Sequence, residues 1–241
     1  MRRAGRIVAG VLEILTRQIK PGMRTIELDA IAAREVGRLG GVPSFKGYHG
    51  YPANLCVSVN DEIVHGIPGA KELREGDIVS LDMGAIFEGF QGDAAVTVGV
   101  GRISAKAQGL VDATREALQA GIAAIRPGAR LGDISAAIQQ YAESRGYGIV
   151  REYSGHGIGR EMHEEPQVPN FGLAGTGPVL KKGMTLALEP MINIGDWHTR
   201  IGGDKWTVLT ADGSLSAHFE HTVAVTDDGA EVLTVRDEGH A

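Results

Sequence analysis

One short motif occurs twice in this sequence, and the repeat limits the folds that the chain can adopt. The segment IKPGMR at residues 19–24 returns as IRPGAR at 125–130, an offset of 106 residues (125 − 19). Each Pro-Gly pair separates two stretches with apolar residues at helical spacing, and β-prone runs follow. Chance agreement between two Pro-Gly stops is the alternative. The shared order of elements favours one domain over residues 1–241, with related halves at approximately 1–103 and 104–241.

Hydrophobic periodicity predicts four helices and two β-rich regions. The predicted helices occupy, in order, residues 7–19, 25–40, 104–125 and about 133–145. Thr25 is expected as the N-cap of the second helix, because acidic residues follow it in the first turn. Short β-prone runs fill residues 55–100 and 184–235. Only two copies of the unit are present, so a solenoid, which needs at least three shorter repeats, is excluded.

The composition excludes several classes of protein. Hydrophobic residues make up 43% and charged residues 22%, a globular balance that excludes wholesale disorder. A formal net charge of -6 and the lack of a basic run argue against a nucleic-acid-binding surface. No apolar run approaches the ~18 residues of a membrane span, and no targeting segment is evident. The single cysteine, Cys56, suits a reducing compartment, so we expect a cytoplasmic protein.

Two acidic residues lie within consecutive β-prone runs. Phe87-Glu88-Gly89 indicates a hairpin turn between the runs. A midpoint between Phe87 and Glu88 would place Asp82 directly opposite Asp93, with Cβ atoms about 4.5–5.5 Å apart on a small, polar face. Like charges that face each other are destabilising, so a divalent cation between them is one expectation. The alternative is that both acids face water on a one-sided sheet.

The C-terminal part contains two more acids of this kind. Glu189 is expected on the small face of a strand, away from its leucine neighbours, and Glu220 on the same face as His218. An acid in mid-strand among apolar residues is costly unless it is paired or binds a metal. Glu189 lies 107 residues after Asp82 (189 − 82), close to the repeat offset. Four such acids, two in each half, favour the metal interpretation.

A histidine extends the candidate ligand set. His156 stands among the glycines of SGHGIG at 154–159, which indicates a turn from which the imidazole projects. A lone histidine in such a loop is more often a turn residue, but four carboxylates reverse that preference. Histidine is a common ligand of Mn, Fe, Co and Zn, whereas sites with oxygen ligands alone suit Mg and Ca. The mixed set suits two divalent ions that share a bridging water.

The ordered set of acids and histidine resembles the five metal ligands of the pita-bread metallopeptidases. Local motifs resemble the type I methionine aminopeptidases in particular: NDEIVHGIP at 60–68, GHGIGR at 155–160, HEEP at 163–166, LEPM at 188–191 and FEHT at 219–222. The resemblance covers nearly the whole chain and is closest to the minimal bacterial form. It implies an α+β pita-bread fold, in which a curved antiparallel sheet carries helices on its outer face and two pseudo-twofold halves are present.

The resemblance also implies a role for each metal ligand. Asp82 and Asp93 would hold one ion, and Asp93 would also bridge to the second. His156 and Glu189 would hold that second ion, with Glu220 as the other bridge. The physiological metal is left open among Co, Mn, Fe and Zn.

The substrate residues likewise follow from the resemblance. His65 would contact the N-terminal region of the substrate, and His163 the scissile carbonyl. A pocket for the methionine side chain would be formed by Phe45, Tyr48, Tyr51, Cys56, Met162 and Trp206. Met162 stands where an aromatic residue is usual in the best-known members, and Phe45 where a small residue is common. His49, near the position of His156 in the other half, is expected to be structural.

These roles predict a metal-dependent aminopeptidase that removes the initiator methionine from nascent proteins when the second residue is small. A hydroxide that bridges the metal ions would attack the scissile carbonyl, and Glu189 would relay the proton to the leaving amine. His163 would stabilise the oxyanion. An Xaa-Pro peptidase of the same fold is the first alternative, although those relatives carry a large extra N-terminal domain. A non-catalytic binding module is the second, but such a protein would be free to lose ligands.

The expected partners follow from this activity. The substrates would be N-terminal methionyl peptides of nascent chains, which is compatible with transient association with the ribosome. We expect a monomer, with no membrane partner and no specific nucleic-acid partner.

Overall fold

The computed structural model describes residues 1–235 of the chain. Within this range the four predicted helices are confirmed, as α1 (Arg2–Gln18), α2 (Thr25–Arg38), α3 (Ala105–Ala123) and α4 (Leu131–Glu143), and the short 3-10 helix η1 covers Tyr48–Gly50. None of the helices in the described range is long and apolar enough to cross a membrane.

The strands form one large antiparallel sheet and two small ones. The large sheet follows the order β1 (Val42–Pro43), β4 (Ile78–Phe87), β5 (Phe90–Gly99), β14 (Glu220–Val225), β9 (Thr185–Leu188), β7 (Ser154–Gly157) and β8 (Glu164–Pro169), with β2 (Cys56–Val59) paired to β4 and β15 (Ala230–Val232) paired to β14. One small sheet contains β13 (Ser216–His218), β10 (Met191–Asn193) and β6 (Gly148–Ile149). The other contains β11 (Thr199–Ile201), β12 (Val208–Thr210) and β3 (Glu62–Val64).

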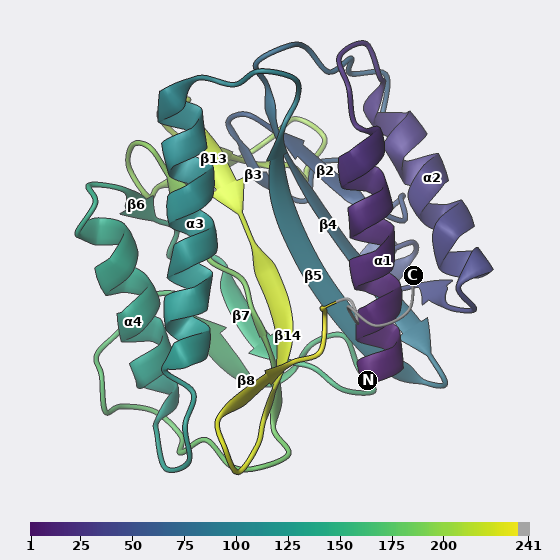
Figure 1. Cartoon of the computed structure of the whole chain (residues 1–241). Helices are drawn as coiled ribbons and strands as arrows, with labels where there is room; N and C mark the ends of the chain where they lie inside the picture. Colours follow the sequence, from purple (N-terminus) through teal and green to yellow (C-terminus); the bar gives the residue numbers. More distant parts are fainter. Residues whose placement is uncertain (236–241) are drawn as a thin grey trace.

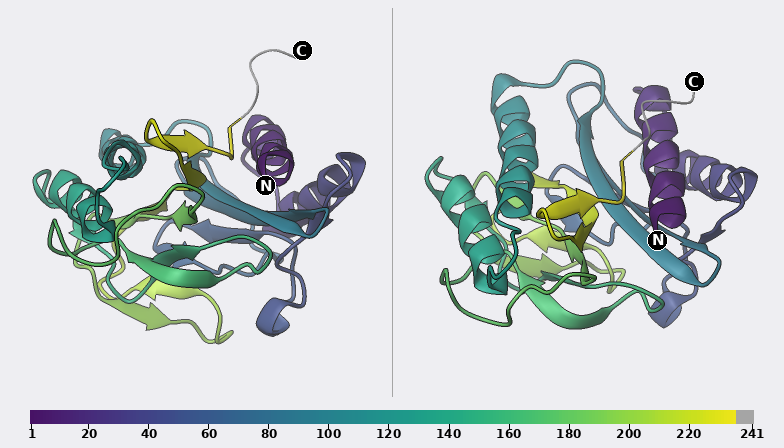
Figure 2. Two further views of the ribbon diagram at one scale, coloured as in Figure 1. Left: turned by 90° about the horizontal axis from the view of Figure 1, so that it is seen from below. Right: turned by 60° about the horizontal axis from the view of Figure 1, so that its bottom comes forward.

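All four helices cover the same face of the large sheet (Figures 1 and 2). Helix α1 packs on β4 and β5, and α2 packs beside α1. Helix α3 packs on β13 and β14, and α4 packs beside α3. The predicted helices on one outer face, with a curved antiparallel sheet beneath them, are therefore observed, and the opposite face of the sheet is left to carry polar side chains.

The apolar core is divided between the two pairs of helices. One cluster of buried side chains joins α1 and α2 to β2, β4 and β5, and includes Leu15, Leu28 and Leu81. A second cluster joins α3 and α4 to the C-terminal strands, and includes Leu118 and Ile134. Each of these side chains is essentially inaccessible to solvent, and burial of one such side chain contributes about 1.5–3 kcal/mol to stability.

The two Pro-Gly segments of the repeat adopt the same local structure. Gly22 and Gly128 have φ angles of 86° and 80°, a left-handed conformation that glycine adopts without a steric cost. The residues at the N-caps of α2 and α4 are Arg24 and Arg130, which also occupy equivalent positions of the repeat. The repeat read from the sequence thus corresponds to two equivalent helix–turn–helix segments.

The expected N-cap of α2 is wrong by one residue. Thr25 is the first helical residue, and its hydroxyl group accepts a hydrogen bond from the N–H of Gly69 at 2.8 Å. The carboxylate of Glu27 instead accepts a bond from the N–H of Arg24 at 2.7 Å and completes the capping box. The hydroxyl group of Thr25 therefore binds the loop before β4 and does not cap α2.

The register of the β4–β5 hairpin also differs from the expectation. Glu88 and Gly89 have φ angles of 50° and 76° and form the two-residue turn, with Phe87 opposite Phe90. This turn shifts the pairing by two residues, so that Asp82 faces Ala95 and not Asp93. A shift of two residues preserves the face, and both acids therefore still point to the polar side of the sheet.

Candidate metal centre and active site

Asp82 and Asp93 are diagonal neighbours on the helix-free face of the large sheet. Gly84 is the residue directly opposite Asp93, and Asp82 lies two residues before Gly84 in β4. Diagonal neighbours have Cα atoms about 7–8 Å apart, a separation that leaves room for an ion between the two carboxylates. The diagonal arrangement therefore suits an ion held between the acids better than the direct opposition expected from the sequence.

Glu220 and Glu189 lie at strand ends, not in mid-strand as the sequence suggested. Glu220 is the first residue of β14 and pairs with Ala95, on the same face as Asp93. Glu189 directly follows the last residue of β9 and precedes Pro190, which has no N–H to continue the ladder. Both carboxylates thus lie at the ends of their strands, and their side chains can turn toward the two aspartates.

His156 lies in the middle of β7 and not in the turn expected from the sequence, because the neighbouring glycines allow the strands to pack closely. A Cβ atom on Gly155 would be 2.3 Å from the carbonyl oxygen of Ala187, and one on Gly157 would be 2.3 Å from that of Glu165. The Nδ1–H of His156 donates a hydrogen bond to the carbonyl oxygen of Gly157 at 2.8 Å. This bond fixes the tautomer, because it leaves the lone pair on Nε2 free to bind a metal.

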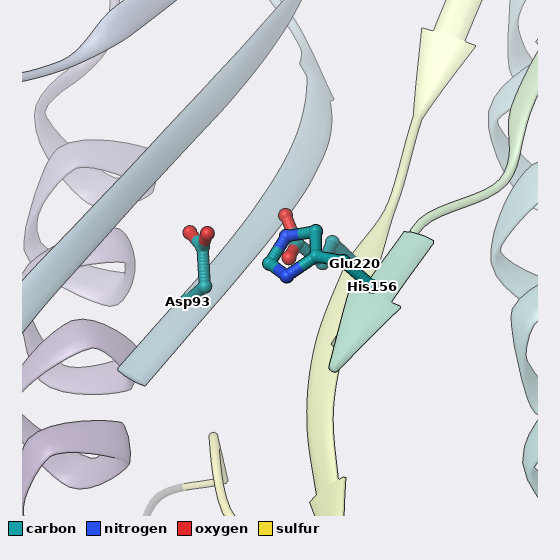
Figure 3. A group of neighbouring side chains, drawn as sticks. All are labelled: Asp93, His156 and Glu220. Atoms are coloured by element: carbon teal, nitrogen blue, oxygen red, sulfur yellow. The ribbon is translucent and has the colours of Figure 1, made fainter. Parts of the chain in front are cut away.

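Three of the predicted ligands meet in one buried cluster (Figure 3). Ligand atoms of Asp93, His156 and Glu220 lie within 4.8 Å of one another, and the three residues come from β5, β7 and β14. Their exposed fractions are 4%, 6% and 3%. The carboxylate of Glu189 lies 3.6 Å from Nε2 of His156 and so adjoins the same cluster.

The polar atoms of this cluster fit a bound cation. One oxygen each of Asp82, Asp93 and Glu220 is buried and has no hydrogen-bond partner among the described residues. A buried carboxylate without a partner is costly, and a divalent cation would satisfy all three. The donors are carboxylate oxygens and one imidazole nitrogen, a set that transition-metal ions bind well.

The titration behaviour of the ligands agrees with a cation site. Burial first, and the neighbouring carboxylates second, raise the pKa values of Asp82, Glu189 and Glu220 well above the usual range. Burial raises the pKa of Asp93 to about 7. Burial lowers the pKa of His156 to about 4, so its ring is neutral at physiological pH. The carboxylates therefore need positive charge to be ionised together, and the histidine is already in its metal-binding form.

A cavity of about 190 Å³ lies beside the cluster, and every residue that the sequence assigned to the site lines it. Its lining includes the predicted metal ligands Asp82, Asp93, His156, Glu189 and Glu220, the histidines His65 and His163, and the predicted pocket residues Phe45, Tyr48, Tyr51, Cys56, Met162 and Trp206. Residues from strands of the large sheet, from η1 and from the loops between strands thus converge on one space.

Aromatic rings form one wall of this cavity. The ring of Tyr51 makes edge-on contacts with Phe45 and Trp206, with centroid distances of 6.5 Å and 5.2 Å. Its hydroxyl group donates a hydrogen bond to the carbonyl oxygen of Gly66 at 2.9 Å, so the polar end of the ring is satisfied inside the protein. The faces that remain toward the cavity are apolar.

The two predicted substrate histidines lie on the cavity wall near the metal cluster. The ring of His163 is 4.2 Å from that of His156, centroid to centroid, and its Nδ1 shares a hydrogen bond of 2.7 Å with the hydroxyl group of Tyr48. His65 directly follows β3 and has a left-handed backbone with φ of 60°. Burial, and then the neighbouring His163, lower the pKa of His65 to about 4.

One cavity residue was not assigned to the site from the sequence. His49, expected to be structural, lines the cavity and packs edge-on against Tyr48 at 4.3 Å. Its backbone φ of 48° turns the chain within η1. The signal that could have found it was the repeat, since His49 precedes His156 by 107 residues (156 − 49).

Comparison with known proteins agrees with this geometry. A profile of metallopeptidase family M24 matches residues 1–227. Methionine aminopeptidase 1 of Bacillus subtilis (strain 168) is 51% identical over 234 residues, which is 97% of this chain and 94% of that protein. The crystal structure of methionine aminopeptidase from Thermotoga maritima matches with a TM-score of 0.97 and 49% identity, and the match covers 98% of this chain and 95% of that one.

A solved prolidase shares the fold at lower identity. The prolidase from Pyrococcus furiosus matches with a TM-score of 0.79 and 23% identity, over 99% of this chain and 63% of its own length. The likeness confirms the predicted pita-bread architecture and carries no further argument about activity. The M24 profile and the identity of about half of all residues confirm the resemblance read from the sequence: the chain belongs to metallopeptidase family M24 and, within it, to the type I bacterial methionine aminopeptidases.

Proposed function

We propose that the protein removes the initiator methionine from nascent chains whose second residue is small, in a metal-dependent reaction. The observation that carries this proposal is that one cavity is lined both by candidate metal ligands and by an apolar aromatic wall. Buried acids and His156, with orphaned carboxylate oxygens, stand at one side, and an apolar wall of aromatic rings stands at the other. The relatives that share half of the sequence are named methionine aminopeptidases.

The metal site is proposed to hold two divalent ions drawn from Co, Mn, Fe and Zn. Asp82 and Asp93 would hold one ion, His156 and Glu189 the other, and Asp93 and Glu220 would bridge them. When bound, the ions would supply a water of lowered pKa and positive charge beside the scissile carbonyl. The diagonal aspartates and the free Nε2 of His156 support this division of the ligands.

Glu189 is proposed as the group that moves the proton. Burial raises the pKa of its carboxyl group, and the carboxylates of Asp82 and Asp93 raise it further. A carboxylate with a raised pKa can accept a proton from the attacking water and return it to the leaving amine. Its place at the end of β9, beside His156, leaves the side chain free to reach the reacting atoms.

His163 is proposed to donate a hydrogen bond to the scissile carbonyl. Burial lowers the pKa of His163 and raises the pKa of Tyr48, so a neutral imidazole meets a protonated hydroxyl group. With the Tyr48 hydroxyl donating to Nδ1 at 2.7 Å, the ring carries its proton on Nε2. A donor placed where negative charge develops is worth roughly 3–4 kcal/mol. His65, on the same wall, would contact the substrate's N-terminal region.

The apolar wall is proposed to receive the methionine side chain. The wall consists of Phe45, Tyr48, Tyr51, Cys56, Met162 and Trp206. Sulfur–aromatic contacts contribute about 0.3–1.5 kcal/mol, which favours a flexible thioether over a branched side chain. The second residue of the substrate would lie against the metal centre, where only a small side chain is accommodated.

We also propose how the protein is organised and where it acts. The chain would form one catalytic domain with halves 1–103 and 104–241, supported by the separate core cluster beneath each helix pair. It would act as a monomer in the cytoplasm on N-terminal methionyl peptides, with transient association with the ribosome. The free, buried thiol of Cys56 supports a reducing compartment.

A panel of tripeptides tests the proposed function. We expect protein loaded with Mn or Co to release methionine efficiently from Met-Ala-Ser and poorly from Met-Arg-Ser. Norleucine in first position should be tolerated and alanine nearly excluded, since each lost methylene costs about 1–3 kcal/mol. Arg-Pro-Pro is the matched substrate for the Xaa-Pro alternative. Efficient cleavage of Arg-Pro-Pro without a preference for methionine would assign the chain to that activity instead.

A further inference from the structure

His218 is a buried histidine to which the proposed mechanism assigns no role. Its exposed fraction is 1%, and neither Nδ1 nor Nε2 has a hydrogen-bond partner among the described residues. A neutral imidazole carries one donor and one acceptor, and buried polar atoms of proteins are almost always satisfied. Both ring nitrogens of His218 are therefore available for bonds that the surrounding side chains do not provide.

The position of His218 places it beside the metal cluster. It is the last residue of β13 and stands two residues before Glu220, so both side chains point to the same face of the extended chain. Its backbone is fixed on both sides: the hydroxyl group of Thr97 donates to its carbonyl oxygen at 2.7 Å and accepts from its N–H at 2.8 Å. The ring is thus held on a rigid element next to a proposed bridging ligand.

The hydroxyl groups of Ser80 and Thr97, the latter bonded to the backbone of His218, are engaged with one another. Ser58, Ser80 and Thr97 occupy opposed positions across β2, β4 and β5 and form a buried polar row. Because Thr97 donates its single hydroxyl hydrogen to the backbone of His218, Ser80 must donate to Thr97, at 2.8 Å. Ser58 accepts from the N–H of Gly66, the residue that follows His65. The hydroxyl hydrogens of Ser80 and Thr97 are therefore both used, and neither can bond to the ring of His218.

His65 is the side chain of the neighbouring element that interacts electrostatically with this histidine. Strand β3, which His65 follows, packs against β13, and the two imidazoles are close enough to interact electrostatically. His218 is absent from the cavity lining, whereas His65 lines it. The left-handed backbone of His65 is a conformation that surrounding contacts must maintain. His218 therefore neighbours His65 but lies outside the lining of the cavity.

We propose that His218 is a positioning residue for His65, acting through a hydrogen bond carried by one buried water molecule between the two rings. The water would pair the unpartnered nitrogens of His218 with the nitrogen of His65 that faces away from the cavity. The bond fixes the orientation and the tautomer of the His65 ring. The inference deepens the proposed function, since it assigns a support to the residue that contacts the N-terminal region of the substrate.

A double-mutant cycle tests this role. We expect His218→Leu to lower kcat/KM for Met-Ala-Ser by about 10- to 100-fold, as loss of a supporting hydrogen bond does, with metal content unchanged. His218→Gln, which keeps a donor and an acceptor, should recover most of the loss. In a His65→Ala background His218→Leu should cost nothing further. Additive losses, or a loss of bound metal in His218→Gln, would overturn the proposal.

Histidine-ring NMR separates this inference from the proposed function, because it needs no turnover. In ¹⁵N-histidine-labelled protein loaded with diamagnetic Zn, His218→Leu and His218→Gln should be compared with His221→Leu. His221 neighbours Glu220 on β14, but its Nδ1 is already paired with the hydroxyl group of Thr234 at 2.8 Å. We expect the ring nitrogens of His65 to shift in His218→Leu and to stay unchanged in His221→Leu. A His65 ring that does not respond to either His218 variant refutes the positioning role, whatever substrate the enzyme cleaves.

Discussion

At the scale of single residues, the chemistry of the site depends on buried side chains with polar atoms that have no hydrogen-bond partner within residues 1–235. Asp82, Asp93 and Glu220 each present an oxygen without a partner among the described residues, and His156 presents Nε2 beside the carboxylate of Glu189, with the tautomer of the ring fixed by Gly157. The identity of these residues could be predicted, because acids in β-prone runs are conspicuous. Their exact contacts could not, since a side chain at a strand end turns according to its tertiary neighbours.

The first prediction separates the metal ligands from the substrate contacts. Glu220→Gln keeps the shape of the side chain but removes a charge that two ions would share, so we expect metal affinity to fall at least about 10-fold. His65→Ala should retain the metal and lose about 10²–10⁴ in kcat/KM, the usual scale for one positioned group. Calorimetric titration of each metal-free variant with Mn measures metal binding, and cleavage of Met-Ala-Ser by the metal-loaded variants measures kcat/KM. An empty site in His65→Ala would contradict the division.

The second prediction concerns a residue behind the apolar wall. A Cβ atom at Gly84 would lie 2.7 Å from the terminal methyl of Met162 and 3.0 Å from the ring of Phe45. Gly84→Ala should therefore push Met162 into the cavity and cost about 1–3 kcal/mol of substrate binding, as overpacking does. We expect KM for Met-Ala-Ser to rise more than kcat falls, and a second change, Met162→Ala, to relieve it. Unchanged KM at full metal content would show that Gly84 does not limit the pocket.

At the scale of elements, periodicity predicted the types of structure and turns decided the details. The four helices and the polar face of the β4–β5 hairpin follow from apolar spacing, which a two-residue shift does not alter. The register does not follow from it, because either Phe87-Glu88 or Glu88-Gly89 could form the turn. The left-handed backbone that Gly89 accepts selects the second pair. His49 was expected to be structural although the repeat relates it to His156, because an irregular segment carries no periodic signal of where its side chain points.

The third prediction tests the turn that sets this register. Gly89 has a φ of 76°, and a Cβ atom there would meet only the flexible end of Arg160 at 3.4 Å. Gly89→Ala should lower the free energy of unfolding by roughly 1–2 kcal/mol, because a left-handed backbone is strained for residues with a Cβ. Gly89→Asn should cost less, since asparagine tolerates that region. Urea unfolding in the presence of a chelator compares them, and equal stability of glycine and alanine would contradict the argument.

At the scale of the whole molecule, the site exists because two similar halves meet. Asp82 and Asp93 come from the sheet beneath α1 and α2, whereas His156, Glu189 and Glu220 come from the strands associated with α3 and α4. Each half brings two of the four acids, so neither half alone would have the complete ligand set. Bringing four carboxylates together raises their pKa values and opposes folding unless charge is neutralised. The fold and the metal are therefore expected to stabilise each other.

The last prediction is that metal uptake releases protons and strengthens as pH rises. Without metal, burial keeps the pKa of Asp93 at about 7 and those of Asp82, Glu189 and Glu220 well above the usual range. Since only ionised carboxylates bind the ions, protons must leave when metal enters, and low pH competes with binding. His156 contributes no proton, because burial lowers its pKa to about 4 and the ring is already neutral.

We therefore expect calorimetric titration with Mn at pH 6, in two buffers of different ionisation enthalpy, to show net proton release. The number released should fall, and the affinity rise, between pH 6 and pH 8, as Asp93 ionises before metal arrives. Because the metal binds only the folded state, the same titration should raise the melting temperature, with about 2.7 kcal/mol of stabilisation at 100 times Kd. Glu220→Gln removes one titrating group and should release fewer protons at pH 6. If binding at pH 6 releases no protons, the carboxylates are already ionised without a cation. Repulsion among the four carboxylates would then not explain why the folded protein needs metal.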